Sequence, residues 1–266
     1  MKEMTLEELQ QVEFDLLDVF ANFCDKHGLT YFLAYGTLIG AARHRGFIPW
    51  DDDIDVMMPR PDYEKFLELY VDSGRYVLKT HDRDSSYFYP FAKLVNSDTK
   101  FIECNCDEST LGVFVDIFPL DGVPTNKIRQ RYRALKWRVL RVLTIHGFNV
   151  ESRDSYLKNN QRAKWIISNI AGTMAKPFKF SSIDKAVNSL STVSDYENFE
   201  MAYCCWQTYS FNSVPKKWFR DYALLPFGDK EYKVHVGWDE WNTHIYGDYM
   251  TPPEHPDHSH GKGYWK

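Results

Sequence analysis

Residues 50–56 read Trp-Asp-Asp-Asp-Ile-Asp-Val and place four carboxylates within five positions. Carboxylates this close repel one another strongly, and a divalent cation is the usual remedy. In an extended chain Asp53 and Asp55 point to one face, while Ile54 and Val56 point to the other. The pattern predicts a strand over residues 54–58 that is buried on its apolar face. Its carboxylates are expected to bind Mg²⁺ or Mn²⁺, since hard oxygen ligands suit these cations.

The same acidic stretch has two other interpretations. Asp51, Asp53 and Asp55 fall on the first, third and fifth positions of an EF-hand loop, but the sixth position is Val56, where that loop needs glycine. The twelfth position is Asp62 rather than glutamate, so the EF-hand is rejected. A plain acidic surface loop stays open, although the immediate continuation into an apolar strand favours the metal site.

Two signals outside the acidic stretch point to the same chemistry. Upstream, an apolar strand over residues 31–35 ends in Gly36-Thr37, and a helical stretch of small residues follows over 38–44. Free backbone N–H groups and a hydroxyl at such a turn suit a phosphate, and glycine lets the ligand approach closely. Downstream, Asp116 lies inside an apolar strand over residues 113–118. A lone acid there is costly unless it joins Asp53 and Asp55 around a metal or caps a neighbouring turn.

Local patterns also predict the flanking elements. Thr5 and Glu8 form a capping box, apolar residues then recur at helical spacing, and Gly28 fits the end of that helix. A second helix is expected over 62–71, strands over 76–80 and 91–95, and a turn at Pro119-Leu120-Asp121-Gly122.

In chain order, Gly-Thr, Asp-x-Asp and a third strand aspartate are similar to the nucleotidyltransferase-type palm fold. Longer blocks resemble the LicD family, and fukutin-like proteins share the core more distantly. The blocks are residues 34–44 (AYGTLIGAARH), 46–56 (GFIPWDDDIDV), Arg60, Asp62-Tyr63-Glu64, Ala92-Lys93, 115–121 (VDIFPLD), 246–250 (YGDYM) and Pro252-Pro253. We therefore expect a mixed α/β fold with a palm core, in one catalytic domain over residues 1–266. A helical basic insertion at 126–182 and a C-terminal tail at 246–266 complete it.

The resemblance implies phosphotransfer, commonly of phosphocholine from CDP-choline to a sugar of a cell-surface glycopolymer such as teichoic acid or lipopolysaccharide. Carried over by position, Asp53, Asp55 and Asp116 are the catalytic metal ligands, and Gly36 and Thr37 hold phosphate. The implied reaction is in-line attack by a sugar hydroxyl on the β-phosphorus, which expels CMP. Asp116 is a candidate acceptor for the hydroxyl proton. A further ligand role for Asp51 or Asp52 stays open.

Several more residues are candidates for substrate binding. Lys93 is either a phosphate counter-charge or a surface lysine, and Arg43 and His44 either contact phosphate or offset the carboxylates. Aromatic rings suit the quaternary ammonium of choline. Trp50 has the best position because it abuts the acids, and the other candidate walls are Tyr35, Trp238 and Trp241. These grounds do not distinguish choline from ethanolamine, glycerol or ribitol.

Composition excludes several classes of protein. The chain has 266 residues, 44% hydrophobic and 26% charged, with a net charge of −5, and its mean hydropathy is −0.48. A disordered chain, a collagen and an integral membrane protein do not fit these values, and the charge argues against nucleic acid as a partner. The N-terminus lacks the apolar core of a signal peptide, and the five cysteines form no zinc pattern. A cytoplasmic enzyme with reduced cysteines is expected.

Charge is unevenly distributed along the chain. Residues 127–180 carry 13 Lys and Arg against two acids, a net charge of +11, and the rest of the chain carries −16. An apolar stripe in this basic segment comprises Ile128, Tyr132, Leu135, Val139, Val142 and Leu143. Such a helix either packs its stripe on the core with a solvated basic face, or lies on an anionic membrane or a polyanion. The second interpretation places the enzyme at the inner face of the membrane, with a lipid-linked glycan as acceptor.

The last third of the chain is less diagnostic. His255, His258 and His260 lie in a Pro-rich stretch and either bind a transition metal or belong to a flexible or loosely docked tail, which we favour. Two other functions stay open for the whole chain. One is a nucleotidyltransferase that attacks the α-phosphorus and releases pyrophosphate, and the other is a non-catalytic metal- or glycan-binding protein.

Overall fold

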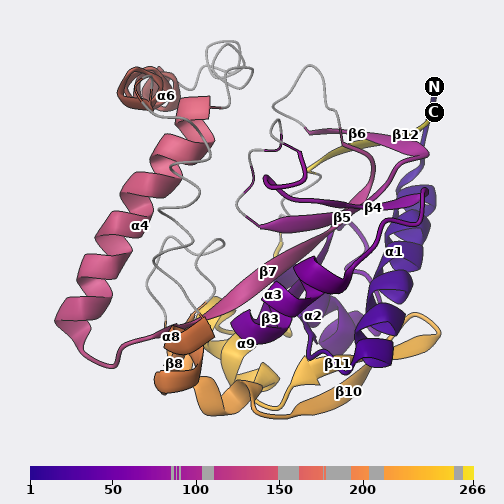
Figure 1. The fold of residues 1–266 in the computed structure, drawn as a ribbon. Helices are drawn as coiled ribbons and strands as arrows, with labels where there is room; N and C mark the ends of the chain where they lie inside the picture. The colour runs from indigo at the N-terminus through magenta and orange to yellow at the C-terminus, as the bar shows by residue number, and fades with distance from the viewer. Residues whose placement is uncertain are drawn as a thin grey trace.

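A computed structural model describes residues 1–84, 87, 89, 91–103, 111–148, 162–175, 177, 193–203, 213–254 and 260–266. Within these residues the largest element is a seven-stranded mixed sheet, whose main strands follow the order β2-β3-β7-β5-β4 (Figure 1). Their bounds are β2 Phe32–Leu33, β3 Ile54–Pro59, β7 Phe114–Val123, β5 Ala92–Asn96 and β4 Tyr76–Lys79. Strands β3 and β7 are parallel, and the other neighbours are antiparallel. The mixed α/β fold predicted from the sequence is confirmed.

The first helix, α1 (Leu6–His27), follows the local signals closely. The Thr5 side chain accepts a hydrogen bond from the Glu8 backbone, the Glu8 side chain bonds back to Thr5, and Gly28 ends the helix with a φ of 64°. Its apolar face packs against β3, β5 and β7, and its Phe20 ring contacts Phe66 of α3 (Arg60–Leu69) at 5.2 Å. Helix α1 therefore covers the sheet together with α3.

The segment before the acidic stretch is more helical than predicted. Strand β2 has only two residues, and α2 (Tyr35–Ile39) begins at the position predicted to end the strand. A π-helical turn over Gly40–His44 continues α2. Tyr35 has a φ of 47°, an uncommon conformation for a large side chain, at the point where the strand turns into the helix. This turn brings Gly36 beside the acidic stretch.

The predicted turn at residues 119–122 is wrong, because β7 continues through Val123. Pro119 and Leu120 pair with the end of β3, and Asp121 to Val123 pair with β8 (Met201–Tyr203), which in turn pairs with β9 (Val214–Pro215). The turn-forming residues are held extended by strands on both sides. Arg60 also neutralises the buried Asp121, with Nε 2.6 Å from one carboxylate oxygen and Nη2 3.0 Å from the other.

The two ends of the chain meet in a second sheet of order β1-β12-β6, at the upper right of Figure 1. Its strands are β1 Lys2–Glu3, β12 Gly261–Trp265 and β6 Thr99–Glu103, and both pairings are antiparallel. The prediction of a flexible or loosely docked tail is therefore wrong for residues 260–266.

The remaining elements surround the central sheet. Helices α4 (Lys127–Phe148) and α6 (Arg162–Ala175) pack on each other at the left of Figure 1, and α8 (Val193–Asn198) lies against β7. A 3-10 helix (Lys216–Phe219), the hairpin β10 (Tyr222–Phe227) and β11 (Lys230–His235), and α9 (Trp238–Tyr246) close the lower side. None of the described helices combines the length and apolar character that a bilayer span requires.

Candidate functional site

Three charged residues form a row across one face of the central sheet. Asp55 of β3 pairs with Asp116 of β7, and Asp116 pairs with Lys93 of β5. Side chains at directly paired positions point to the same face of a sheet. The sequence pattern implied this convergence for the two aspartates, and the strand register brings it about.

The row is buried. The exposed fraction is 5% for Asp55, 2% for Lys93 and 9% for Asp116. Lys93 Nζ lies 2.5 Å from Asp116 Oδ1 and 3.3 Å from the centroid of the Phe114 ring. The interpretation of Lys93 as a surface lysine is therefore wrong. Burying the charged carboxylate of Asp116 in an apolar strand is costly, and the buried Lys93 is its partner.

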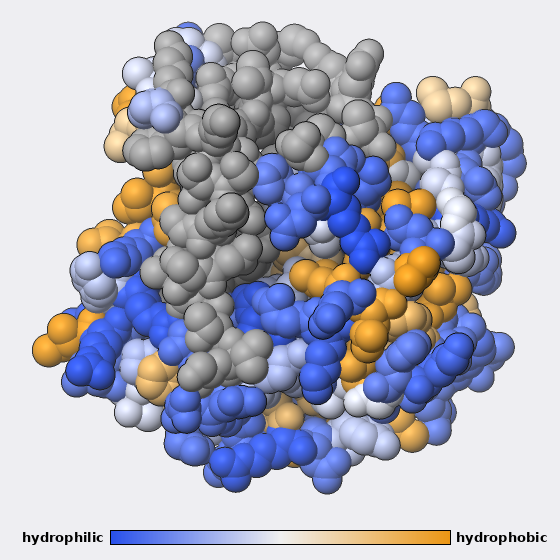
Figure 2. All heavy atoms as spheres, viewed as in Figure 1, coloured by the Kyte–Doolittle hydropathy of each residue, from blue (hydrophilic) through white to orange (hydrophobic). Residues whose placement is uncertain are grey.

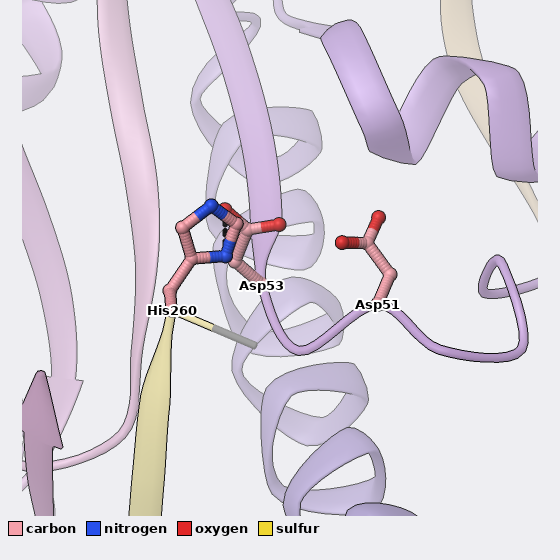
Figure 3. Close-up of side chains that lie close together, drawn as sticks. All are labelled: Asp51, Asp53 and His260. Atoms are coloured by element: carbon pink, nitrogen blue, oxygen red, sulfur yellow. Dashed lines mark ion pairs between the residues drawn. The ribbon is translucent and has the colours of Figure 1, made fainter. Parts of the chain in front are cut away.

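A second group of ligand atoms lies just before β3. One ligand atom from each of Asp51, Asp53 and His260 falls within 4.8 Å of the others, close enough to share a metal ion (Figure 3). His260 Nδ1 is 3.5 Å from Asp53 Oδ2. The aspartates come from the loop that leads into β3, and His260 comes from the residue before β12. Asp53 thus belongs to this group and lies two residues before Asp55, which pairs with Asp116.

Asp52 has a different environment from its neighbours. It is 2% exposed, its Oδ1 accepts hydrogen bonds of 2.9 Å from both the backbone N–H and the Nδ1 of His260, and its Oδ2 accepts one of 3.2 Å from the Gly261 N–H. Burial alone would raise the pKa of Asp52, but these hydrogen bonds outweigh burial and lower it. Asp52 therefore anchors the start of β12, which explains why His260 lies in the cluster.

The other carboxylates are hard to ionise together. Burial, then the charge of Asp53, raises the pKa of Asp51 to about 7. Burial raises the pKa of Asp116 to about 6, although Lys93 opposes the rise. Burial, then Asp53 and Asp116, raises the pKa of Asp55 well above its usual range. Such mutual repulsion fits a site whose resident charge is a cation, and the all-oxygen aspartate set suits a hard divalent ion.

His260 supplies positive charge to the same cluster. The hydrogen bond to Asp52, and then the charges of Asp53, Asp52 and Asp51, raise its pKa to about 9 against the effect of burial. Sequence reasoning left a transition-metal role open for this histidine but favoured a flexible or loosely docked tail. The signal was its two-residue spacing from His258, but nothing local linked it to the acidic stretch.

Gly36 and Thr37 support the acidic stretch directly. A Cβ on Gly36 would lie 2.7 Å from Asp51 Oδ2, so any larger residue would require that carboxylate to shift. The Thr37 hydroxyl accepts a hydrogen bond of 2.8 Å from the Asp55 backbone N–H. Both residues predicted to hold phosphate therefore border the carboxylates, and Thr37 also holds the start of β3 in place.

Arg43 and His44 make protein contacts at the end of the π-helical turn. Arg43 Nε donates to His44 Nε2 at 2.8 Å, and Arg43 Nη1 donates to the Tyr249 carbonyl at 2.5 Å. Burial, then the charge of Arg43, lowers the pKa of His44, so the ring is held neutral as an acceptor. Arg43 thereby ties this turn to the segment after α9.

The aromatic residues considered for choline binding lie in two environments. Trp50 and Trp238 are half-buried and pack on a small cluster of Ile39, Ile48 and Tyr249, and the Trp50 ring is 6.4 Å from His44. Tyr35 and Trp241 are only 3% and 2% exposed and belong to the main core. Of the four candidates, Trp50 and Trp238 have the more accessible rings.

Glu13 of α1 is a buried acid that sequence reasoning missed. It is 1% exposed, and burial, then Asp53, Asp52 and Asp51, raises its pKa well above the usual range. The signal was present in the sequence, since Glu13 falls on the apolar face of α1 beside Val12 and Leu16. Helix α1 thus places a further carboxyl behind the acidic stretch.

Some predicted features lie outside the described residues. These are His255 and His258, the cysteines Cys104, Cys106, Cys204 and Cys205, and the parts of the basic insertion at 149–161, 176 and 178–182. Cys24, within the described part of the chain, is buried with a free thiol.

Comparison with known proteins agrees with this geometry. The family model described as "LicD/FKTN/FKRP, nucleotidyltransferase domain" matches residues 28–140. The chain is 31% identical over 273 residues to a Haemophilus influenzae protein named lipopolysaccharide cholinephosphotransferase LicD, covering 98% of this chain and 97% of that protein. A stretch of 44 residues, 16% of this chain and 14% of its relative, is 41% identical to an uncharacterised protein of Rickettsia typhi.

A mixed sheet that brings aspartates together on neighbouring strands, within a matched nucleotidyltransferase-type domain, defines the class as a transferase. The near full-length similarity then identifies the family, and the chain belongs to the LicD family of phosphotransferases.

Proposed function

We propose that this enzyme transfers phosphocholine from CDP-choline to a sugar hydroxyl of a lipopolysaccharide-type glycan in a Mg²⁺-dependent reaction that releases CMP. The observation that carries the proposal is the cross-strand pair of Asp55 and Asp116, with Asp53 two residues before Asp55, in a chain related over nearly its whole length to a lipopolysaccharide cholinephosphotransferase. The acceptor is a glycan or lipid-linked glycan. The enzyme works at the inner face of the membrane, which it contacts peripherally.

The carboxylates are the proposed metal ligands. Asp53, Asp55 and Asp116 form the set predicted from the sequence, and Asp51 with His260 borders Asp53 on the solvent side. Bound Mg²⁺ would neutralise phosphate oxygens of the donor and stabilise the departing CMP. Gly36 and Thr37 border this set, and we assign them to the donor phosphates.

The chain's own residues orient the reacting groups. Lys93 holds the Asp116 carboxylate in place through its 2.5 Å ion pair. The pKa of Asp116, which burial raises to about 6, suits a group that accepts the proton of the attacking hydroxyl near neutral pH. Trp50, half-buried beside the acidic stretch, is the proposed wall for the quaternary ammonium of choline, with His44 at its edge.

The test is incubation of the enzyme with Mg²⁺, a panel of CDP-alcohols and lipopolysaccharide acceptors, with CMP release as the readout. CDP-choline should give CMP and a phosphocholine-modified glycan. Asp55→Asn should lower the rate by on the order of 100-fold or more, because the charge stabilisation that a metal supplies is worth several kcal/mol.

Asp98→Asn is the matched control. Asp98 lies in an exposed ion pair with Arg75 at 3.3 Å, away from the cluster, so its loss should leave the rate unchanged. Pyrophosphate release from a nucleoside triphosphate, with no CMP from any CDP-alcohol, would support nucleotidyl transfer instead. A rate that Asp55→Asn leaves unchanged would refute the assigned site.

A further inference from the structure

Helices α4 and α6 expose apolar side chains to solvent. On α4 the exposed fractions are 78% for Ile128, 59% for Tyr132, 62% for Leu135 and 48% for Val139. On α6 the exposed apolar residues are Ile166, Ile167, Ile170 and Met174, at 46% to 56%. Figure 2 shows apolar atoms along the left margin of the molecule, where α4 lies in Figure 1. The interpretation of the α4 stripe as packed on the core is therefore wrong for these four residues.

The α4 residues form one row that faces away from the protein. Ile128, Tyr132, Leu135 and Val139 follow one another at intervals of four, three and four residues, which keeps them on one face of a helix. Gln130 and Ala134, on the opposite face, are buried, and Gln130 Nε2 donates to the Pro124 carbonyl at 2.7 Å. The contacts of α4 with the rest of the protein thus leave its apolar row outward.

Basic residues flank the row on both sides. Neither α4 nor α6 contains an acidic residue, whereas together they carry nine Lys and Arg. Arg129 and Lys136 fall on one side of the row and Arg131 on the other, and all three are exposed. Long basic side chains beside an apolar row can reach lipid phosphates while the row enters the acyl boundary.

We infer that the outer face of α4 docks on an anionic phospholipid bilayer, with its apolar row inserted and the flanking arginines and lysines at the headgroups. A second copy of the chain would bring the same positive charge to this face and be repelled. A polyanionic glycan would match the charge but would leave the apolar row in water. The inference rests on the proposed function for its setting, a lipid-linked acceptor at a membrane, but its test requires no transfer activity.

Docking of this face would also orient the site. Strand β7, which carries Asp116, runs directly into α4 after three intervening residues, 124–126. A bilayer that holds α4 therefore holds the strand that carries Asp116 at a fixed height above the lipid surface, where a lipid-linked acceptor presents its sugar.

The test is sedimentation of the full-length protein with vesicles of phosphatidylglycerol and phosphatidylcholine, in about 0.1 M salt, where charges act over about 10 Å. The wild-type protein should bind these vesicles and bind pure phosphatidylcholine weakly. Tyr132→Ser/Leu135→Ser/Val139→Ser should weaken binding by about tenfold or more, since it removes the inserted apolar area. Arg129→Gln/Arg131→Gln/Lys136→Gln should weaken it by about a hundredfold.

Val71→Ser/Leu224→Ser/Met250→Ser is the matched control, because these residues are also exposed, by 80%, 50% and 51%, but lie elsewhere. It should bind as the wild type does. Thermal unfolding confirms that each variant is folded, and Leu135→Ser alone replaces the triple variant if that variant is unstable. No binding to anionic vesicles by the wild type, or equal binding by the row variant, overturns the inference. So does a wild-type dimer in light scattering that the row variant makes monomeric.

Discussion

At the scale of single residues, the ion pair of Lys93 and Asp116 has consequences for stability. Both groups are almost fully buried and 2.5 Å apart, so the lysine and the aspartate compensate each other's charge away from solvent. Lys93→Met leaves Asp116 without this partner, and the loss of one partner of a buried pair costs about 3–5 kcal/mol. We expect Lys93→Met to lower the free energy of unfolding by that amount, measured by urea unfolding with a chelator present.

The double variant separates the ion pair from side-chain packing. Lys93→Met/Asp116→Asn removes the second charge as well, so it should be less destabilised than Lys93→Met alone. If the two changes are additive, the pair does not couple in the folded state and its assigned role is refuted. The half-exposed pair of Lys79 and Asp84, 2.9 Å apart, is the comparison, and Lys79→Met should cost less than about 1 kcal/mol.

At the scale of elements, Asp52 fixes β12 and so brings His260 to the cluster. Three hydrogen bonds from His260 and Gly261 end on its carboxylate, and a buried bond to a charged group contributes about 1.5–3 kcal/mol. Asp52→Ala should therefore free β12, with faster hydrogen exchange at the amides of Gly261–Trp265 and a fall in unfolding free energy of a few kcal/mol.

Glu3→Gln provides the control in the same sheet. Glu3 pairs with Lys262 of β12 at 2.7 Å, but both side chains are more than half exposed. Its loss should cost less than about 1 kcal/mol and leave β12 protected. Unchanged exchange at β12 in Asp52→Ala would show that the strand pairings alone hold this end of the chain.

The elements also show which features a sequence can predict. The ends of α1 were predictable because a capping box and a C-terminal glycine act within a few residues. The paired aspartates of β3 and β7 were predictable because each stands out in an apolar strand. The predicted turn at 119–122 failed because β3, β8 and Arg60 outweigh local turn preference. The link of His260 to the acidic stretch was missed because its partner Asp52 is 208 residues away, and such a contact leaves no local pattern.

At the scale of the whole molecule, the two charge regions have separate places. The carboxylates gather where β3, β7 and β5 lie together, whereas α4 and α6 carry the described part of the basic segment at one side of the molecule (Figure 1). The net charge of −5 conceals this separation, since the segment 127–180 carries +11 and the rest −16. An anionic surface is attracted by one region and repelled by the other, so the charge distribution favours a single orientation of the enzyme at a membrane.

The stability of the whole molecule should depend on pH through His235 of β11. His235 is fully buried among the rings of Phe219, Trp241 and Phe32, at 4.4, 5.6 and 5.8 Å, and neither ring nitrogen has a hydrogen-bond partner in the described structure. Burial lowers its pKa to about 3. In the unfolded chain the pKa is about 6.5. Below that pH the imidazole of His235 is protonated in the unfolded state but stays neutral in the native state.

The stability that neutral His235 provides is therefore complete above about pH 6.5 and is lost as the pH falls toward 3. His235→Phe keeps an aromatic ring in this cluster and removes the group that can take up a proton. Between these two pKa values, each pH unit changes the free energy of unfolding by about 1.4 kcal/mol. Between about pH 7.5 and about pH 5, the wild type should lose about 2 kcal/mol more unfolding free energy than the variant. Urea unfolding of both proteins with a chelator present measures this difference, because the other titrating groups contribute equally to each. Parallel pH profiles would show that His235 is protonated in the folded protein, which its purely aromatic surroundings oppose.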